Sequence, residues 1–186
     1  MRLEDDMVIT PDGAELWYWV RRCDNGPAPA VLLIHGAASN HTRWTEFTRH
    51  TTLSERYDLV RPDMRGNARS MYRGRLDLGV WCRDLAALLD AENYGPAIVV
   101  GHSLGAQIAL HLAATHPERV GALALIDPVV PQALTGKQLW MKRMGPLIRL
   151  AIWIGRAANR LGLRRRSFPL MDLEALDAQT RKDMRG

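Results

Sequence analysis

The segment AIVVGHSLG, residues 97–105, decides the fold of this 186-residue chain. Its apolar, β-branched first half predicts a strand, and a helical pattern at residues 104–115 follows directly. Between the two stands G-x-S-x-G, in which small residues on either side of the serine relieve the crowding of a sharp, strained turn. Such a turn exposes the hydroxyl of Ser103 and places the next backbone N–H at a helix N-terminus. The alternative interpretation is a tight strand-to-helix turn in which the serine is incidental.

Strand and helix signals alternate on both sides of this segment, as far as residue 128. Residues 30–34 form a short, continuously apolar run, which suits a strand covered by helices on both faces. Two earlier runs flank the turn-like Pro11-Asp12-Gly13 and predict a hairpin. Strands separated by helices predict an α/β fold, with a doubly wound, mostly parallel sheet and flanking helices. The other expected elements are strands at 7–10, 15–20, 57–60 and 122–126, and helices at about 43–54 and 79–93.

Length and composition limit the class of protein. The chain is 47% hydrophobic and 24% charged, which suits about one globular domain and excludes a disordered chain, a collagen-like repeat and a disulfide scaffold. The two cysteines, Cys23 and Cys82, are expected to be reduced thiols in a cytoplasmic protein. The N-terminus is acidic where a signal peptide would be basic, and no apolar stretch approaches the length of about 18 residues that a spanning helix needs.

The net charge of +5 comes from one segment of the chain. Residues 129–170 contain nine Lys and Arg residues and neither Asp nor Glu, and removing those nine cations leaves a net charge of −4. A local basic stretch is weaker evidence for nucleic-acid binding than a uniformly basic chain would be. Because no fold-level motif accompanies the charge, no nucleic-acid partner is expected.

A second motif, His35-Gly36-Ala37, follows the strand at 30–34. Its glycine lets the backbone turn, so that the N–H of Ala37 can point toward the space beside Ser103. Together with the N–H that follows the serine, it could there hold an oxyanion. The imidazole of His35 is expected to be a structural hydrogen-bonding group rather than a catalytic base.

Charged residues follow two other predicted strands. Asp63 and Arg65 come after the strand at 57–60, and they are expected to form a local ion pair that fixes the loop. Asp127 follows the strand at 122–126, at the end where catalytic groups of open α/β sheets gather. It is a candidate catalytic acid, and the alternative is a structural role in its loop.

These motifs, in this order, resemble the α/β-hydrolase family, and in particular its serine esterase, C–C hydrolase and haloperoxidase-like branch. The resemblance covers about residues 7–128. It implies that Ser103 is the nucleophile, and that the backbone N–H groups of Ala37 and Leu104 hold the oxyanion of an ester or other acyl substrate. It implies neither a metal nor an organic cofactor. The residues that carry the resemblance are His35, Gly36, Asp63, Arg65, Gly66, Gly101, His102, Ser103, Gly105 and Asp127.

The base that would activate the serine is missing from its expected place. In this family the acid and then the histidine follow the serine along the chain. After Ser103 only His111 and His116 occur, and the helix that the serine precedes carries both away from its hydroxyl. His102 is adjacent, and neighbouring side chains on such a turn diverge. His41 and His50 precede the serine, in the loop and helix after the first parallel strand, and they are not expected to act as the base.

Residues 129–186 are expected to be distinct from a core of residues 1–128. Their segment 137–166 combines the nine cations with Trp and aliphatic side chains. Because the family inserts a helical cap at this point of the chain, we interpret residues 129–186 as the start of a cap or lid over the pocket, followed by a polar tail. The alternative is an interfacial helix that rests on an anionic membrane surface.

We therefore expect a serine hydrolase that cleaves a small-molecule ester or related acyl compound through an acyl-Ser103 intermediate. A complete domain of this family would have about 250 residues, so we expect an N-terminal portion that lacks the last strands and the histidine and whose activity is impaired. One alternative is a degenerate, non-catalytic α/β-hydrolase-fold protein that binds ligands. Another is cofactor-independent oxygenase or haloperoxidase-type chemistry. The substrate's identity and the oligomeric state stay open.

Overall fold

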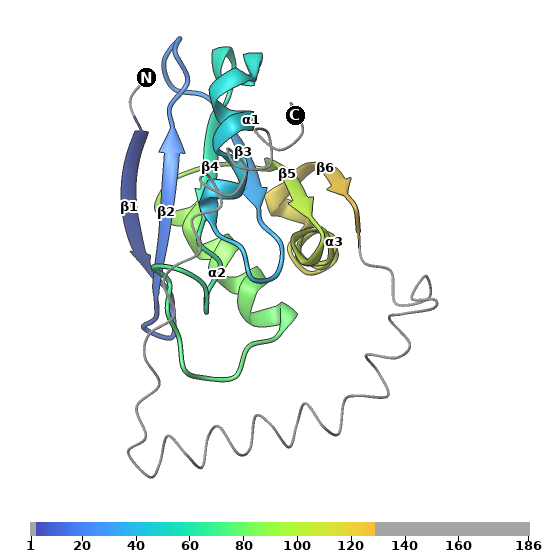
Figure 1. Ribbon diagram of the computed structural model, residues 1–186. Helices are drawn as coiled ribbons and strands as arrows, with labels where there is room; N and C mark the ends of the chain where they lie inside the picture. Colours follow the sequence, from blue (N-terminus) through green and yellow to red (C-terminus); the bar gives the residue numbers. More distant parts are fainter. Residues whose placement is uncertain (1–2, 129–186) are drawn as a thin grey trace, which may run out of the picture. The chain divides into compact units, whose positions relative to one another are not determined.

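The computed structural model describes residues 3–128, which form one six-stranded sheet with helices on its faces (Figure 1). The expected cap and tail at residues 129–186, with their basic segment, lie outside the described residues.

The sheet begins with the predicted antiparallel hairpin. β1 (Leu3–Ile9) and β2 (Glu15–Arg21) pair along their full lengths. The turn closes where the N–H of Gly13 donates to the carbonyl of Thr10 at 2.8 Å, and Gly13 has a φ of +81°, which a residue without Cβ adopts readily. β2 also pairs antiparallel with β4 (Asp58–Pro62), so the hairpin extends one side of the sheet.

Four parallel strands form the rest of the sheet. β3 (Ala30–Ile34) lies between β4 and β5 (Ala97–His102), and β6 (Val120–Ile126) pairs with β5. The strand order is β1-β2-β4-β3-β5-β6, so the chain winds from β3 first to β4 and then back to β5 on the other side. This arrangement confirms the α/β class with a mostly parallel sheet. It also brings the carboxyl ends of four strands to one edge, where ligands of such sheets bind.

Two hydrophobic cores lie on opposite faces of the sheet. The first core lies between the sheet and the helices α2 (Leu78–Ala91) and α3 (Leu104–Thr115), and it includes Leu32 of β3. The second core lies on the other face, where Leu33 of β3 packs with Trp44. Successive residues of β3 face different cores because the side chains of a strand alternate. The bounds of α2 and α3 agree with the predicted helices to within two residues.

The helical pattern at about 43–54 forms three short helices, so the prediction of one continuous helix is wrong. Thr51 has an extended ψ of 141°, and its hydroxyl accepts the N–H of Leu53 at 3.2 Å. A threonine side chain that bonds the backbone in this way competes with the helical hydrogen bonds and ends the helix. The three elements are the 3-10 helix η1 (His41–Trp44), α1 (Thr45–His50) and the 3-10 helix η2 (Thr52–Glu55).

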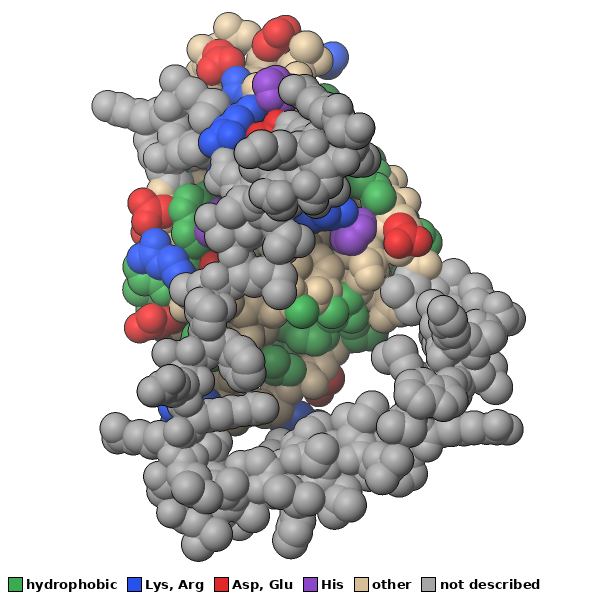
Figure 2. All heavy atoms as spheres, in the orientation of Figure 1, with side chains coloured by type: hydrophobic (Ala, Val, Ile, Leu, Met, Phe, Trp, Pro, Cys, Tyr) green, Lys and Arg blue, Asp and Glu red, His purple; other side chains and the backbone are tan. Residues whose placement is uncertain are grey.

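β6 differs from the other parallel strands because its side chains are exposed. Leu125 is 38% exposed and Ile126 is 45% exposed, whereas every residue of β3 is buried. Within residues 3–128 β6 pairs with β5 alone and is the edge strand of the described sheet. Within the described residues, this apolar run is therefore not covered on both faces as the run at 30–34 is. Figure 2 shows hydrophobic side chains, in green, on the visible surface of the described residues.

Both cysteines are free thiols, as expected. Cys23 is half-buried and Cys82 is buried in α2, where burial raises the pKa of its thiol to about 11. Among residues 3–128, no helix is long and apolar enough to cross a membrane.

Candidate active site

Ser103 occupies the strained turn that its motif predicts. It lies between the end of β5 and the start of α3, with φ of 54° and ψ of −115°. This backbone conformation is rare for a residue with a side chain and persists only where the surroundings enforce it. The N–H of Ser103 donates to the carbonyl of Ile126 at 2.9 Å, and its own carbonyl accepts the N–H of Ala106 at 3.0 Å. The turn is therefore held by both the neighbouring strand and the helix.

The two glycines of the motif are required by close backbone contacts. A Cβ placed on Gly101 would lie 2.6 Å from the backbone nitrogen of Ala106, and one on Gly105 would lie 2.6 Å from the carbonyl oxygen of His35. Real Cβ atoms do not approach backbone atoms so closely. Gly101 and Gly105 thus allow α3 to start directly against the ends of β3 and β5.

The loop after β3 lies against the serine. A Cβ on Gly36 would be 3.2 Å from both Cβ of Ser103 and Nδ1 of His102. Ala37 follows this glycine, and Leu104 is the first residue of α3, where N–H groups have no acceptor within the helix. The structure therefore brings the two predicted oxyanion segments to the same edge of the sheet as Ser103.

His35 is buried and both its ring nitrogens bond to the backbone. Nε2 accepts the N–H of Met64 at 3.0 Å, so Nδ1 carries the proton and donates to the carbonyl of Gly36 at 2.8 Å. Burial, which penalises the charged ring, lowers the pKa of His35. A neutral imidazole thus ties the end of β3 to the end of β4, in agreement with the expected structural role.

The free energy of unfolding is expected to decrease as the pH falls below about 6.5, the ordinary pKa of histidine. In that range the unfolded chain binds a proton at His35 and the folded chain does not, so protonation favours unfolding by at most about 1.4 kcal/mol per pH unit for this group. Urea unfolding between about pH 7.5 and 5.5 measures the slope. His35→Gln should reduce it, whereas His50→Asn, which removes an exposed histidine of α1, is the matched control and should leave it nearly unchanged. An undiminished slope in His35→Gln would contradict the prediction.

The expected ion pair between Asp63 and Arg65 does not form. Asp63 accepts the backbone N–H of His41 at 2.8 Å, the ring Nδ1–H of His41 at 2.9 Å and the N–H of Arg69 at 3.1 Å. Arg65 instead binds Asp84 of α2 and the hairpin turn of β1 and β2. Burial favours the protonated form of Asp63, but the hydrogen bonds from His41 and from the N–H of Arg69 together outweigh it and lower the pKa of Asp63. The loop is fixed, but by His41, a partner that the sequence did not indicate.

His102 points toward Arg43 of η1 and not into a hydrogen bond with the serine. Nη2 of Arg43 lies 3.4 Å from Nε2 of His102. Partial burial, together with the Arg43 cation, lowers the pKa of His102, and Asp127 acts in the opposite direction. Arg43 carried no signal in the sequence, because only the fold brings η1 to His102, the residue before the candidate nucleophile.

The two histidines that follow Ser103 along the chain, which were not expected to act as the base, belong to α3 and its C-terminal end. His111 is in α3 and His116 follows its end, with Nδ1 2.8 Å from the hydroxyl of Thr115. Asp127 follows β6 at the same edge as Ser103, with a φ of +47°. Within residues 3–128, no hydrogen bond joins the hydroxyl of Ser103 to a histidine, and no group of three His, Cys, Asp or Glu could hold a metal ion.

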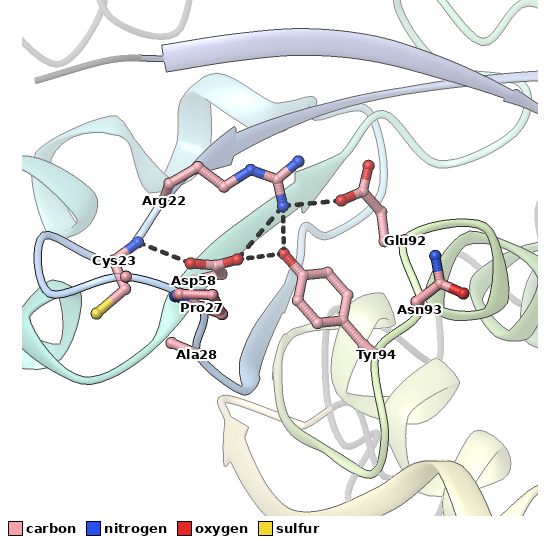
Figure 3. A pocket seen from close by; sticks show the side chains of 9 residues that line it. Arg22, Cys23, Pro27, Ala28, Asp58, Glu92, Asn93 and Tyr94 are labelled. Carbon is pink, nitrogen blue, oxygen red and sulfur yellow. Dashed lines mark hydrogen bonds and ion pairs between the residues drawn. The ribbon is translucent and has the colours of Figure 1, made fainter.

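A hollow of about 460 Å³ lies beside the start of β4, at the amino ends of the parallel strands and so at the opposite end from Ser103 (Figure 3). Nη1 of Arg22 donates to Glu92 at 2.8 Å, to the hydroxyl of Tyr94 at 2.7 Å and to Asp58 at 3.3 Å. The hydroxyl of Tyr94 donates to Asp58 at 2.6 Å, and the N–H of Cys23 donates to the other carboxylate oxygen at 2.7 Å. These groups bond to one another and tie β2, β4 and the end of α2 together. The edge that carries Ser103 is therefore the candidate active site.

Known proteins are similar to this chain over part of its length. A sequence model of the family described as alpha/beta hydrolase fold matches residues 29–178. The chain is 41% identical to the lipase LipV of Mycobacterium tuberculosis over 62% of this chain and 42% of LipV. It is 32% identical to the uncharacterized hydrolase YraK of Bacillus subtilis over 68% of this chain and 46% of YraK. A solved structure of a hydrolase from Pseudomonas aeruginosa PA01 has a TM-score of 0.64 at 25% identity, over 78% of this chain and 53% of that one. The chain spans less than half the length of either curated relative.

Proposed function

Because this chain belongs to the alpha/beta hydrolase fold family, we propose that it is a serine hydrolase of an ester or a related acyl compound, with Ser103 as nucleophile. The observation that carries the proposal is the strained turn at Ser103, enforced by backbone contacts at Gly101 and Gly105. Strain of this kind is retained where the exposed position of a side chain matters. The likeness to a lipase and to a hydrolase supports the same class of reaction.

In the proposed reaction, the hydroxyl oxygen of Ser103 attacks the carbonyl carbon of the ester. The carbonyl oxygen becomes an oxyanion, and the backbone N–H groups of Ala37 and Leu104 donate to it. Collapse of this intermediate expels the alcohol, which takes up the serine proton through a base, and leaves the acyl group on Ser103. Water then attacks the acyl-enzyme, releases the carboxylic acid and restores the serine.

The proposal assigns the acid of the triad to Asp127, which lies at the carboxyl end of β6 and whose charge acts on His102. The base that would accept the proton of Ser103 is not assigned among residues 3–128. All six histidines of the chain lie within residues 3–128, and in that part none hydrogen-bonds to the hydroxyl of Ser103. This observation favours a second candidate function, in which the same site binds an acyl compound without cleaving it.

A fluorophosphonate probe distinguishes the two functions. If Ser103 is activated, its hydroxyl oxygen should bond to the phosphorus of the probe with loss of fluoride, so the folded chain gains one phosphonyl group at this residue. The labelling rate should fall by at least about a hundredfold in Ser103→Ala, because this variant lacks that hydroxyl and the remaining serines, with ordinary pKa values, are weak nucleophiles. Intact mass spectrometry and peptide mapping measure the label.

Ser54→Ala is the matched control, because it removes a hydroxyl that bonds only within its own segment, to the carbonyl of Thr51. It should label like the unaltered chain. A folded chain that does not label, or that labels equally in Ser103→Ala, would remove the hydrolase proposal. Saturable binding of a non-reactive acyl amide would then support the second function.

A further inference from the structure

Arg43 is an exposed cation that the fold holds beside the candidate nucleophile. Its guanidinium Nη2 lies 3.4 Å from Nε2 of His102, the residue that precedes Ser103. The imidazole of His102 in turn borders Gly36, whose backbone lies against Cβ of Ser103. Arg43, His102 and the loop after β3 therefore belong to one small region at the carboxyl ends of the parallel strands.

The contact defines which groups stay available for a ligand. A guanidinium has five N–H donors and no acceptor, so Nε2 of His102 must accept and the ring must be neutral, with its proton on Nδ1. This contact uses one of the five donors. Within residues 3–128, no carboxylate lies within ion-pair distance of Arg43, although Arg65, Arg69 and Arg119 all have such partners.

The segment that carries Arg43 is anchored on both sides. Asn40 accepts the N–H of Thr42 at 2.9 Å and starts η1, and the ring of His41 stacks on Trp19 with centroids 3.4 Å apart. The N–H and ring of His41 also bind the buried carboxylate of Asp63. Trp44, the next residue after Arg43, is buried in the second core. The backbone that carries Arg43 is therefore already ordered before a ligand binds, so only the arginine side chain itself has to be immobilised.

We propose that Arg43 is a specificity-determining residue, which selects acyl substrates that carry an anionic group, a carboxylate or a phosphate, close to the scissile ester. The inference rests on the proposed function, because it assigns a substrate class to that same site. A guanidinium with free donors binds carboxylate and phosphate oxygens in pairs, which a neutral group cannot match. Asp127 is the opposing charge that acts on His102, so the anion is expected on the Arg43 side of this ring.

The test measures binding and does not depend on turnover. Butyrate, propyl phosphate and butyramide are titrated into the full chain, and the ring resonance of His102, assigned with His102→Asn, is followed by NMR. The two anions should bind at least about tenfold more tightly than the amide, because hydrogen bonds to a charged group are the stronger ones. The preference should weaken as salt is added.

Arg43→Gln should remove the preference for anions, and Arg43→Lys should retain part of it. The matched control is Arg49→Gln, which removes an exposed cation that bonds to Glu46 at 3.3 Å on the neighbouring α1. Equal binding of the three compounds, or an equal loss in Arg43→Gln and Arg49→Gln, would overturn the inference. Binding by only one of the two anions would support it and identify the group. A chain that binds anions in this way but does not react with the fluorophosphonate loses the proposed hydrolysis alone.

Discussion

Gly105→Ala is expected to lower the free energy of unfolding by about 3 kcal/mol or more, although alanine is the better helix former. The new methyl group would lie 2.6 Å from the carbonyl oxygen of His35 and closer still to that of Ile34. Both oxygens belong to backbone at the buried end of β3, which pairs with β5 through Gly101. Neither can move away as a flexible side chain would, so α3 must shift or the strand pairing must break.

Gly79→Ala is the matched control because each glycine is the second residue of its helix. A Cβ on Gly79 would meet only the ends of the Arg83 and Asp77 side chains at 3.4 Å, which is ordinary contact. This substitution should stabilise the protein by up to about 1 kcal/mol through helix propensity. Urea unfolding followed by circular dichroism measures both changes. Equal effects of the two substitutions would contradict the prediction that the backbone at Gly105 leaves no room for a methyl group.

Arg65→Met is expected to destabilise the fold by about 3–5 kcal/mol, the usual result of breaking one side of a buried ion pair. Arg65 is 2% exposed and Asp84 of α2 is 1% exposed. Nε of Arg65 donates to Asp84 at 2.8 Å, and its other nitrogens reach Asp12 at 2.6 and 2.7 Å and Thr10 at 2.9 Å. Removing the guanidinium leaves the carboxylate of Asp84 buried without its partner.

The pH dependence of this variant provides a second test. Burial raises the pKa of Asp84, and the Arg65 cation opposes that rise. Without the cation the folded-state pKa should rise further above the unfolded value, so the carboxylate's penalty is largest at neutral pH and shrinks as the pH falls toward about 4. The loss of stability in Arg65→Met should therefore be smaller at low pH.

Two further variants separate the buried charge from general effects of losing an arginine. Arg65→Met combined with Asp84→Leu removes both charges and should recover part of the stability lost in the single variant. Arg69→Met removes an exposed arginine that pairs with Asp5 and lies 3.5 Å from the ring centroid of Trp17, and it should cost about 1 kcal/mol. If Arg65→Met costs no more than Arg69→Met, the buried pair does not stabilise the fold as argued.

The six strands, α2, α3 and the turn at Ser103 were predicted from the sequence alone, because the determinants of these elements are local. The first strand differs in its bounds, since β1 begins at Leu3, four residues before the predicted strand at 7–10. A short run of β-branched residues predicts a strand. The glycines at 101 and 105 indicate backbone positions that have no room for a side chain. The prediction of one helix at about 43–54 was wrong for an equally local reason. The spacing of apolar residues does not reveal that the hydroxyl of Thr51 bonds to the backbone and ends the helix.

Only the tertiary structure decided which charged groups meet. The sequence predicted that Asp63 would pair with Arg65, two residues away, but the fold gives Arg65 partners 19 and 53 residues distant and brings Arg43 to His102 across 59 residues. Ion pairs and hydrogen bonds of this kind depend on strand order and on which helix covers which face, and neither leaves a trace in local spacing. The sequence by itself determined the elements and the strained serine between β5 and α3. Packing determined the neighbours of that serine, because they come from segments that are adjacent only in the folded sheet.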